Sequence, residues 1–104
     1  MKSITVVELK EKFDKKEPFI LLDVREINEI LHAKIDPHIN IPIGNIVNKH
    51  KELNKKKAFV VMCHTGVRSA QVCQYLEPLG YNVANLEGGI QAWSLVVDPA
   101  VPQY

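Results

Sequence analysis

The chain has 104 residues, of which 46% are hydrophobic and 24% charged, with 13 Lys and Arg against 12 Asp and Glu. This length fits a single domain over residues 1–104, which can bury a core without disulfides or a structural metal. The formal net charge of +1 gives no electrostatic reason to expect nucleic acid or membrane as a partner. No stretch approaches the roughly 18 apolar residues that a membrane span needs. The composition excludes a disulfide-rich secreted miniprotein.

The first half of the chain alternates between helical and strand-like periodicity. Thr5 and Glu8 form the S/T-x-x-E pattern of a capping box, which predicts a helix that is closed by Pro18. A continuous apolar run follows and is typical of a buried parallel strand. In order, we expect a helix from Thr5, a strand over residues 19–22, a short helix over 27–31, a strand over 39–43 and a polar helical segment to Leu53.

The second half continues the alternation. Residues 58–62 are the clearest strand, residues 63–68 form a loop, and Ser69 is the predicted N-cap of a helix. That helix has an apolar face and a stop at Gly80; the residues of the face are Val72, Cys73, Leu76 and Leu79. A strand over 82–86 and a last helix carrying Ile90 and Trp93 follow. The pattern predicts an α/β fold with a mainly parallel central sheet and helices on both of its faces.

Cys63 is the candidate nucleophile, because it is the first residue after a predicted strand, where ligands bind in open α/β sheets. A tight loop that runs into a helix directs backbone N–H groups and positive potential at one point, and Arg68 adds a full charge. These features favour thiolate over thiol. The predicted substrate-binding residues are His64, Thr65, Gly66, Val67, Arg68 and Ser69. The alternative is that Cys63 is a small buried residue at a strand end.

Other candidate groups carry weaker signals. Cys73 lies on an apolar helix face and is interpreted as core packing, with a resolving cysteine as the alternative. Asp23 and Arg25 follow a buried strand, either supporting the site from behind or acting structurally, as a helix cap and an ion pair. No Cys or His spacing indicates a metal. The lysines at positions 49, 51 and 55–57 form a basic patch that is typical of a solvated face, with docking of an acidic partner as the alternative.

Four motifs then give the chain a family resemblance. The segment CHTGVRSA at 63–70 resembles the active-site loop of the rhodanese (thiosulfate sulfurtransferase) family. LDVRE at 22–26, NIP at 40–42 and LEGGI at 86–90 with Ala92 and Trp93 are similar to its other motifs, in family order. The family usually has Gly-His-Ile-Pro-Gly-Ala where this chain has residues 33–38, AKIDPH. We expect a loop there that preserves the fold.

The resemblance implies a sulfurtransferase that needs no cofactor. Cys63 would take the outer sulfur of thiosulfate or of a protein persulfide and pass it to a thiophilic acceptor. Four residues separate Cys63 from Arg68, whereas similar cysteine phosphatases have five, which disfavours a phosphatase. The main alternative is a non-catalytic rhodanese-fold module for interaction or redox sensing.

The remaining expectations concern partners and compartment. The tail from Trp93 to Tyr104 is similar to that of rhodanese domains fused to adenylyltransferases, which implies a ubiquitin-like sulfur carrier as acceptor; a cysteine desulfurase is the matching protein donor. Glu8 precedes any apolar signal core, and the cysteines are expected to be unpaired. Both observations favour the reducing cytoplasm.

Overall fold

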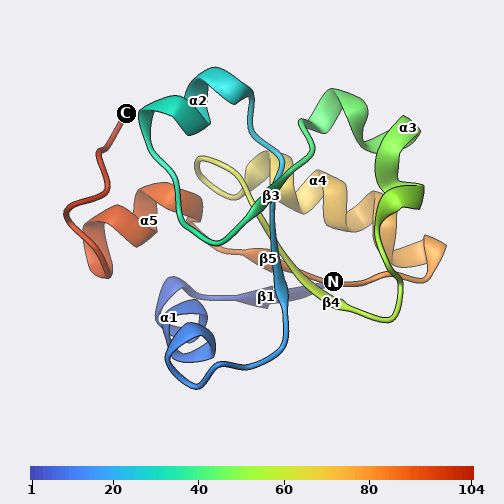
Figure 1. Ribbon diagram of the computed structural model, residues 1–104, viewed down its shortest axis with the longest axis horizontal. Helices are drawn as coiled ribbons and strands as arrows, with labels where there is room; N and C mark the ends of the chain where they lie inside the picture. Colours follow the sequence, from blue (N-terminus) through green and yellow to red (C-terminus); the bar gives the residue numbers. More distant parts are fainter.

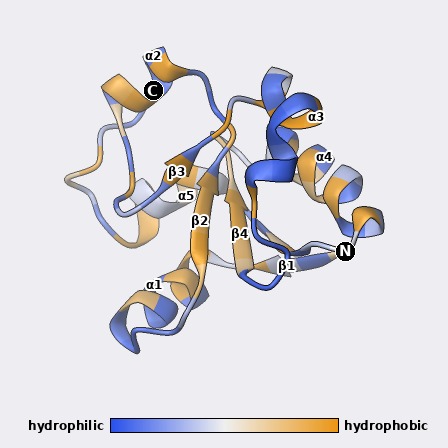
Figure 2. Ribbon diagram, turned by 45° about the vertical axis from the view of Figure 1, so that its right-hand side comes forward, coloured by the Kyte–Doolittle hydropathy of each residue, from blue (hydrophilic) through white to orange (hydrophobic).

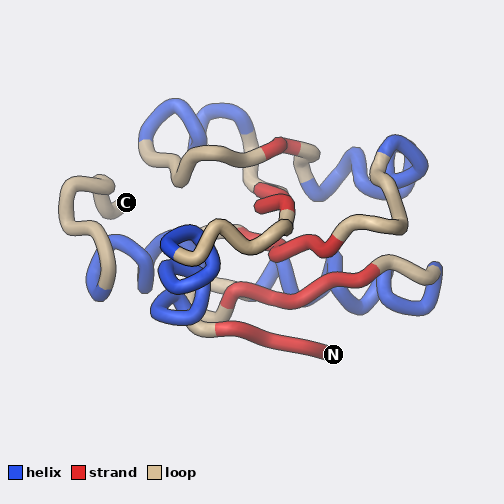
Figure 3. Tube along the Cα trace, turned by 60° about the horizontal axis from the view of Figure 1, so that its bottom comes forward, coloured by secondary structure: helices blue, strands red, loops and turns tan.

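Five parallel strands form the centre of the computed structural model, which describes residues 1–104. Their order across the sheet is β1-β5-β4-β2-β3. The strands are β1 (Lys2–Ile4), β2 (Ile20–Asp23), β3 (Ile39–Asn40), β4 (Ala58–Met62) and β5 (Asn82–Leu86). The α-helices are α1 (Val6–Asp14), α2 (Ile27–His32), α3 (Ile46–Lys49), α4 (Val67–Leu76) and α5 (Gly89–Val96). Short 3-10 helices are η1 (Ile43–Asn45), η2 (His50–Glu52) and η3 (Glu77–Leu79), and Figure 3 shows the strands gathered between the helices.

Both faces of the sheet are buried, because alternate side chains of the central strands enter two separate cores. Leu22 and Val61 pack in the core on the side of α3 and α4, while Leu21 and Val60 pack in the core on the side of α1 and α5. Figure 1 shows the two helix pairs on opposite sides, and Figure 2 shows β2 and β4 in the hydrophobic colour. The predicted fold class, a mainly parallel sheet covered on both faces, is therefore confirmed.

Several predicted elements are confirmed together with their local causes. The Thr5 hydroxyl accepts a hydrogen bond from the Glu8 N–H (3.2 Å), and the Glu8 carboxylate accepts one from the Thr5 N–H (3.0 Å), which closes the capping box of α1. Strands β4 and β5 have the predicted bounds. Trp93 is buried in the core beside α1, as expected of an apolar helix position.

Two strand predictions are wrong. β1 was missed; it has only three residues and pairs with β5 alone, at the edge of the sheet. The strand predicted over 39–43 ends at Asn40, because Pro42 has no N–H to donate to a ladder and Ile43 begins η1. The N–H of Ile43 donates to the Val24 carbonyl instead (2.9 Å), which turns the chain away from the sheet.

The predicted apolar face of α4 is one residue too long. Val72, Cys73 and Leu76 are buried in one core, but the α-helix ends at Leu76 and Leu79 is 39% exposed. Pro78 cannot donate an N–H to an α-helical turn, and the chain tightens into η3 before Gly80 stops it in the left-handed region at φ 96°.

The segment that departs from the usual family motif, residues 33–38, is a loop, as expected. Ala33 and Ile35 turn inward to the core beside α1, and the Asp36–Pro37 peptide bond is cis. After α5 the chain continues as a loop (Figure 3), and its end lies beside α2 in Figures 1 and 2. None of the helices combines the length and apolar character that crossing a membrane requires.

Candidate active site

Cys63 lies at the carboxyl end of the sheet, directly after β4 and four positions before α4 begins. Its parallel neighbours β2 and β5 end at the same edge, and each continues into a segment that contacts the loop of residues 63–69. The side chain of Cys63 is buried, with only 1% of the residue exposed. The loop after a central strand is the location at which this architecture places ligands.

Hydrogen-bond donors surround the sulfur of Cys63. The Gly66 N–H donates to Sγ at 3.1 Å, and the Ser69 hydroxyl lies 3.3 Å from it. Burial alone would raise the pKa of Cys63, but hydrogen bonds from the Ser69 hydroxyl and from the N–H groups of Ser69, Gly66 and Thr65 outweigh it. The pKa of Cys63 therefore lies below its ordinary value, because these donors stabilise the thiolate more than burial penalises it.

The prediction that Ser69 is the N-cap of α4 is wrong, because Gly66 occupies that position. Ser69 is fully buried in the first helical turn, and its hydroxyl faces both Cys63 Sγ and Asn85 Oδ1, the latter at 2.5 Å. A hydroxyl has one hydrogen to donate, so Asn85 and the thiolate compete for it. Asn85 also donates to the Gly66 carbonyl (3.2 Å). Asn85 was not predicted from the sequence, although a polar residue between two apolar residues of a predicted strand was an available signal.

The start of α5 fixes the backbone of the loop of residues 63–69. The N–H of Ile90 donates to the Cys63 carbonyl and the N–H of Gln91 to the His64 carbonyl, both at 3.0 Å. A Cβ at Gly89 would lie 2.4 Å from the His64 carbonyl oxygen, so only glycine allows this approach. Gly66, whose N–H donates to the sulfur, adopts φ 102°, a left-handed conformation in which the loop turns into α4. The C-terminal glycine motif is thus part of the support of the active-site loop.

Asp23 and Arg25 lie behind the site as a fully buried ion pair, with Nη2 and Oδ2 2.8 Å apart. Arg25 also donates to the Ala33 carbonyl (2.9 Å), which fixes the start of the loop over residues 33–38. Asp23 does not cap the following helix, since the N-cap of α2 is Glu26. Asn40 donates to the carbonyls of both Asp23 and Arg25. The hydrogen bonds of this pair do not include Cys63 Sγ, and a supporting role for it stays a prediction.

Arg68 is engaged by a carboxylate that sequence reasoning missed. Its guanidinium forms a bidentate pair with Glu29 of α2, at 2.7 Å (Nη1 to Oε1) and 2.9 Å (Nη2 to Oε2). The guanidinium holds the pKa of Glu29 at about 2, far below its ordinary range. Glu29 also completes a capping box with Glu26. The sequence contains this E-x-x-E pattern, but it does not indicate that Glu29 pairs with Arg68. Anion binding by Arg68 stays a prediction.

His64 is covered by Tyr104, from the far end of the chain. The two rings are stacked with centroids 4.0 Å apart and an interplanar angle of 10°. The Tyr104 hydroxyl donates to Glu29 Oε2 and accepts from Arg25 Nη1, each at 2.8 Å. His64 Nε2 is buried without a hydrogen-bond partner. The tail therefore reaches back to the active-site loop, a placement that the sequence did not predict.

Thr65 and Val67 complete the predicted set, and both side chains are exposed. The N–H of Thr65 faces Cys63, so this residue acts on the sulfur through its backbone. No group of three or more His, Cys, Asp or Glu side chains is arranged to hold a metal ion.

Cys73 occupies a different environment in α4. It is fully buried with Val72 and Leu76, and both cysteines are free thiols. Burial and the nearby Glu77 carboxylate raise the pKa of Cys73 to about 12. The interpretation of Cys73 as core packing agrees with this position.

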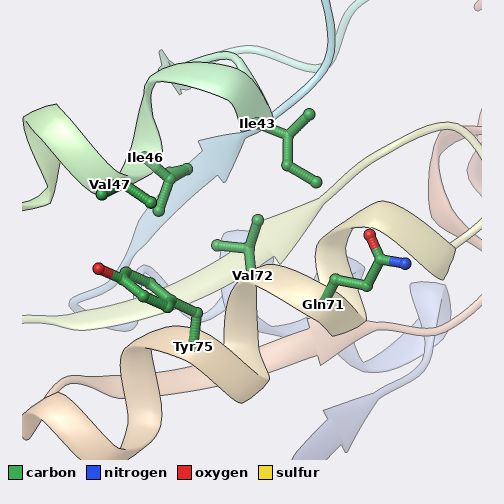
Figure 4. Close-up of a pocket in the computed structure, with 6 residues that line it drawn as sticks. All are labelled: Ile43, Ile46, Val47, Gln71, Val72 and Tyr75. Atoms are coloured by element: carbon green, nitrogen blue, oxygen red, sulfur yellow. The ribbon is translucent and has the colours of Figure 1, made fainter.

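An apolar groove of about 170 Å³ runs between α4 and the segment of η1 and α3 (Figure 4). Its lining is almost entirely hydrophobic and consists of Ile43, Ile46, Val47, Gln71, Val72 and Tyr75. It contains no nucleophile or charged group, and Cys63 lines none of the hollows of the surface. The candidate nucleophile therefore lies outside this groove, in the loop after β4.

The chain matches a known protein family over most of its length. Residues 5–95 match the family model described as a rhodanese-like domain. The chain belongs to this family.

Its relatives and structural neighbours agree. A putative sulfurtransferase of Bacillus subtilis, YtwF, is 40% identical over 89% of this chain and 90% of its own length. A sulfurtransferase of Allochromatium vinosum is 36% identical over 83% of this chain and 81% of its own length. A rhodanese-related protein of Thermoplasma volcanium superposes with a TM-score of 0.89 at 36% identity, with both chains covered completely. These findings support a sulfurtransferase role.

Proposed function

We propose that the chain transfers sulfane sulfur through a persulfide on Cys63. The observation that carries the proposal is the cradle around Sγ, in which three backbone N–H groups and the Ser69 hydroxyl lower the pKa of a buried thiol. A thiolate is the form of cysteine that attacks sulfur. The buried Cys73, with its raised pKa, is unsuited to this role.

In the first half-reaction the Cys63 thiolate attacks the outer sulfur of the donor. With thiosulfate, a new S–S bond forms, the donor S–S bond breaks, and its electron pair leaves on sulfite. The outer sulfur of the resulting persulfide carries the negative charge. The N–H donors that surround Sγ are positioned to stabilise that anion, as preorganised dipoles do in an oxyanion hole.

In the second half-reaction a thiophilic acceptor attacks the outer sulfur and regenerates the Cys63 thiolate. This sequence is a ping-pong reaction with a covalent intermediate. It requires no oxidant, metal or organic cofactor, because the sulfur is carried at one oxidation level throughout. His64, Thr65, Gly66, Val67, Arg68 and Ser69 are the proposed substrate-binding residues. Asp23 and Arg25 are proposed to act indirectly, since Arg25 donates to the Tyr104 hydroxyl and the Tyr104 ring stacks on His64.

The names of two relatives support a proposal about the sulfur acceptor. The chain is 38% identical over 97% of its length to the adenylyltransferase and sulfurtransferase MOCS3-2 of Zea mays, of which it corresponds to 23%. It is 33% identical to a putative sulfur carrier protein, YrkF, of Bacillus subtilis. We therefore propose a ubiquitin-like sulfur carrier as acceptor and a cysteine desulfurase as protein donor. Two free thiols suit the reducing cytoplasm.

Intact mass spectrometry tests the proposal. Incubation with thiosulfate, or with a low-molecular-weight persulfide, should add the mass of one sulfur atom. Cys63→Ser should abolish the adduct, and Cys73→Ser should retain it, which makes the second variant the matched control. Absence of an adduct with both donors would instead favour a non-catalytic module. Turnover of an aryl phosphate that depends on Cys63 would favour a phosphatase.

A further inference from the structure

The ion pair between Arg68 and Glu29 has a consequence for donor choice. Arg68 is the one permanently charged side chain in the loop of residues 63–69, and its guanidinium already faces two carboxylate oxygens at 2.7 and 2.9 Å. This bidentate pair occupies the Nη1 and Nη2 edge of the guanidinium, which is the edge that a second anion would need for bidentate binding. The local charge of the pair is zero, so the loop attracts an anionic donor only weakly.

Glu29 is built into its position. Besides the two donors of Arg68, it accepts from the Tyr104 hydroxyl at 2.8 Å and from the Glu26 N–H at 3.1 Å. Tyr104 is in turn fixed by its stack on His64 and by Arg25. The Glu29 side chain is only 16% exposed, so water screens the pair less than it screens a fully exposed one. Exchange of Glu29 for a substrate anion would break contacts from three separate segments.

We infer that Glu29 determines donor selectivity: by neutralising Arg68 it disfavours dianionic thiosulfate and favours sulfane sulfur carried with less negative charge, as in the persulfide of a thiol. The inference rests on the proposed function, since it concerns the donor that loads Cys63. Glu29 acts through Arg68 and is a positioning residue; nothing places it in contact with Cys63 Sγ. The donor class that it selects is a persulfide presented by a small thiol or by a protein.

Two donors that share a reacting sulfur isolate the effect of charge. Thiosulfate is a dianion and leaves as sulfite; methanethiosulfonate is a monoanion and leaves as methanesulfinate. In both, the Cys63 thiolate bonds to the outer sulfur, and the donor S–S bond breaks with its electron pair on the leaving group. The measured quantity is the ratio of kcat/KM for thiosulfate to kcat/KM for methanethiosulfonate, with cyanide as acceptor.

Glu29→Gln keeps the shape of the side chain and one of its two acceptor oxygens, and it leaves the charge of Arg68 uncompensated. The ratio should rise by about tenfold, because an uncompensated positive charge near the site attracts the thiosulfate dianion more strongly than the methanethiosulfonate monoanion. The gain should appear mainly in KM for thiosulfate and should shrink at high salt. An unchanged or lowered ratio would overturn the inference.

Glu87→Gln is the matched control, since Glu87 is an exposed carboxylate just after β5, at the same edge of the sheet. It makes the same change in net charge without a contact to Arg68, and should alter the ratio by less than about twofold. An equal rise in this variant would mean that net charge, and not the pair, sets selectivity.

A double-mutant cycle assigns the effect to Arg68. In an Arg68→Gln background, Glu29→Gln should lose most of its gain; a gain that persists in full would overturn the role of the pair. Glu29→Asp, which keeps the charge, should stay close to the parent ratio, and a rise equal to that of Glu29→Gln would count against the inference. Formation of the sulfur adduct on Cys63 is scored separately by mass, so loss of the adduct with every donor identifies failure of the proposed function itself.

Discussion

The two cysteines of this chain are ten positions apart, but they occupy opposite chemical environments. Cys63 lies in a loop at the sheet edge, with backbone N–H groups and the Ser69 hydroxyl directed at its sulfur. Cys73 lies on the inner face of α4 among aliphatic side chains, fully buried and without a hydrogen-bond donor for its thiolate. Both thiols are almost completely inaccessible, at 1% and 0% exposure.

Burial is thus shared by the two thiols and does not decide their reactivity. Burial raises the pKa of both, but only Cys63 has donors that reverse the effect. The difference comes from the position of each thiol relative to α4. Cys63 precedes the helix and faces N–H groups that are free at its start, whereas Cys73 lies inside the helix, where the N–H groups are already bonded. The position of each cysteine relative to the start of α4 therefore explains why only the thiolate of Cys63 is stabilised.

The largest expected effect is a difference in alkylation. At pH 7 a thiol of pKa about 12 carries roughly a thousandfold less thiolate than one near its ordinary value, and the pKa of Cys63 is lower still. Iodoacetamide should therefore modify Cys63 at least about a thousandfold faster than Cys73. Peptide mapping by mass spectrometry gives the two rates. In urea the two rates should converge, and similar rates in the native protein would remove the distinction between the thiols.

The next effect is on stability. Cys73→Ser places a hydroxyl among aliphatic side chains and should lower the free energy of unfolding by about 2 kcal/mol. Cys63→Ser replaces a thiol that already faces polar donors and should cost less than about 1 kcal/mol. Urea titrations of both variants measure the difference. If the two substitutions cost the same, the contrast between polar and apolar surroundings is wrong.

The pH dependence of stability should come from the site around Cys63, where Glu29 and Arg68 form an ion pair. The pKa of Glu29 is about 2 in the folded state against an ordinary 4.5. A lowered folded pKa stabilises the protein above pH about 4.5, and this contribution is lost as the pH falls towards 2. With screening, we expect a loss of about 1.5 kcal/mol. Urea titrations between pH 5 and pH 2 should show a smaller decline for Glu29→Gln than for the parent.

The smallest effect concerns the Ser69 hydroxyl. Ser69→Ala removes one donor to Cys63 and should raise the pKa of that thiol, because the thiolate loses a hydrogen bond that stabilises it. The pH profile of Cys63 alkylation should shift upward accordingly, while that of Cys73 stays in place. Thr65→Ala is the control, because Thr65 acts on the sulfur through its N–H. If the Ser69→Ala profile coincides with that of the parent, the backbone N–H groups alone stabilise the thiolate, and the assigned role of the Ser69 hydroxyl is wrong.

The sequence by itself determined the features that depend on neighbours along the chain. The capping box at Thr5, the strands β4 and β5, and the place of Cys63 directly after a strand are all local patterns. The tight loop around Sγ also follows from adjacent residues, since Gly66 lies only three positions beyond Cys63. Short-range hydrogen bonds and periodicity depend on consecutive residues, so most of these features were predicted correctly. The exceptions lie at prolines, since the strand predicted over 39–43 ends before Pro42 and α4 ends before Pro78.

Tertiary structure decided the polar partners of the site. Asn85 meets Ser69 across 16 positions, Glu29 meets Arg68 across 39, and Tyr104 meets Glu29 across 75. The sheet order brings β2, β4 and β5 to one edge, and only that arrangement gives Ser69 a second acceptor and Arg68 a counterion. Ser69 was misread as a helix cap for the same reason: its hydroxyl bonds to a neighbouring strand, which no pattern in its own segment reveals.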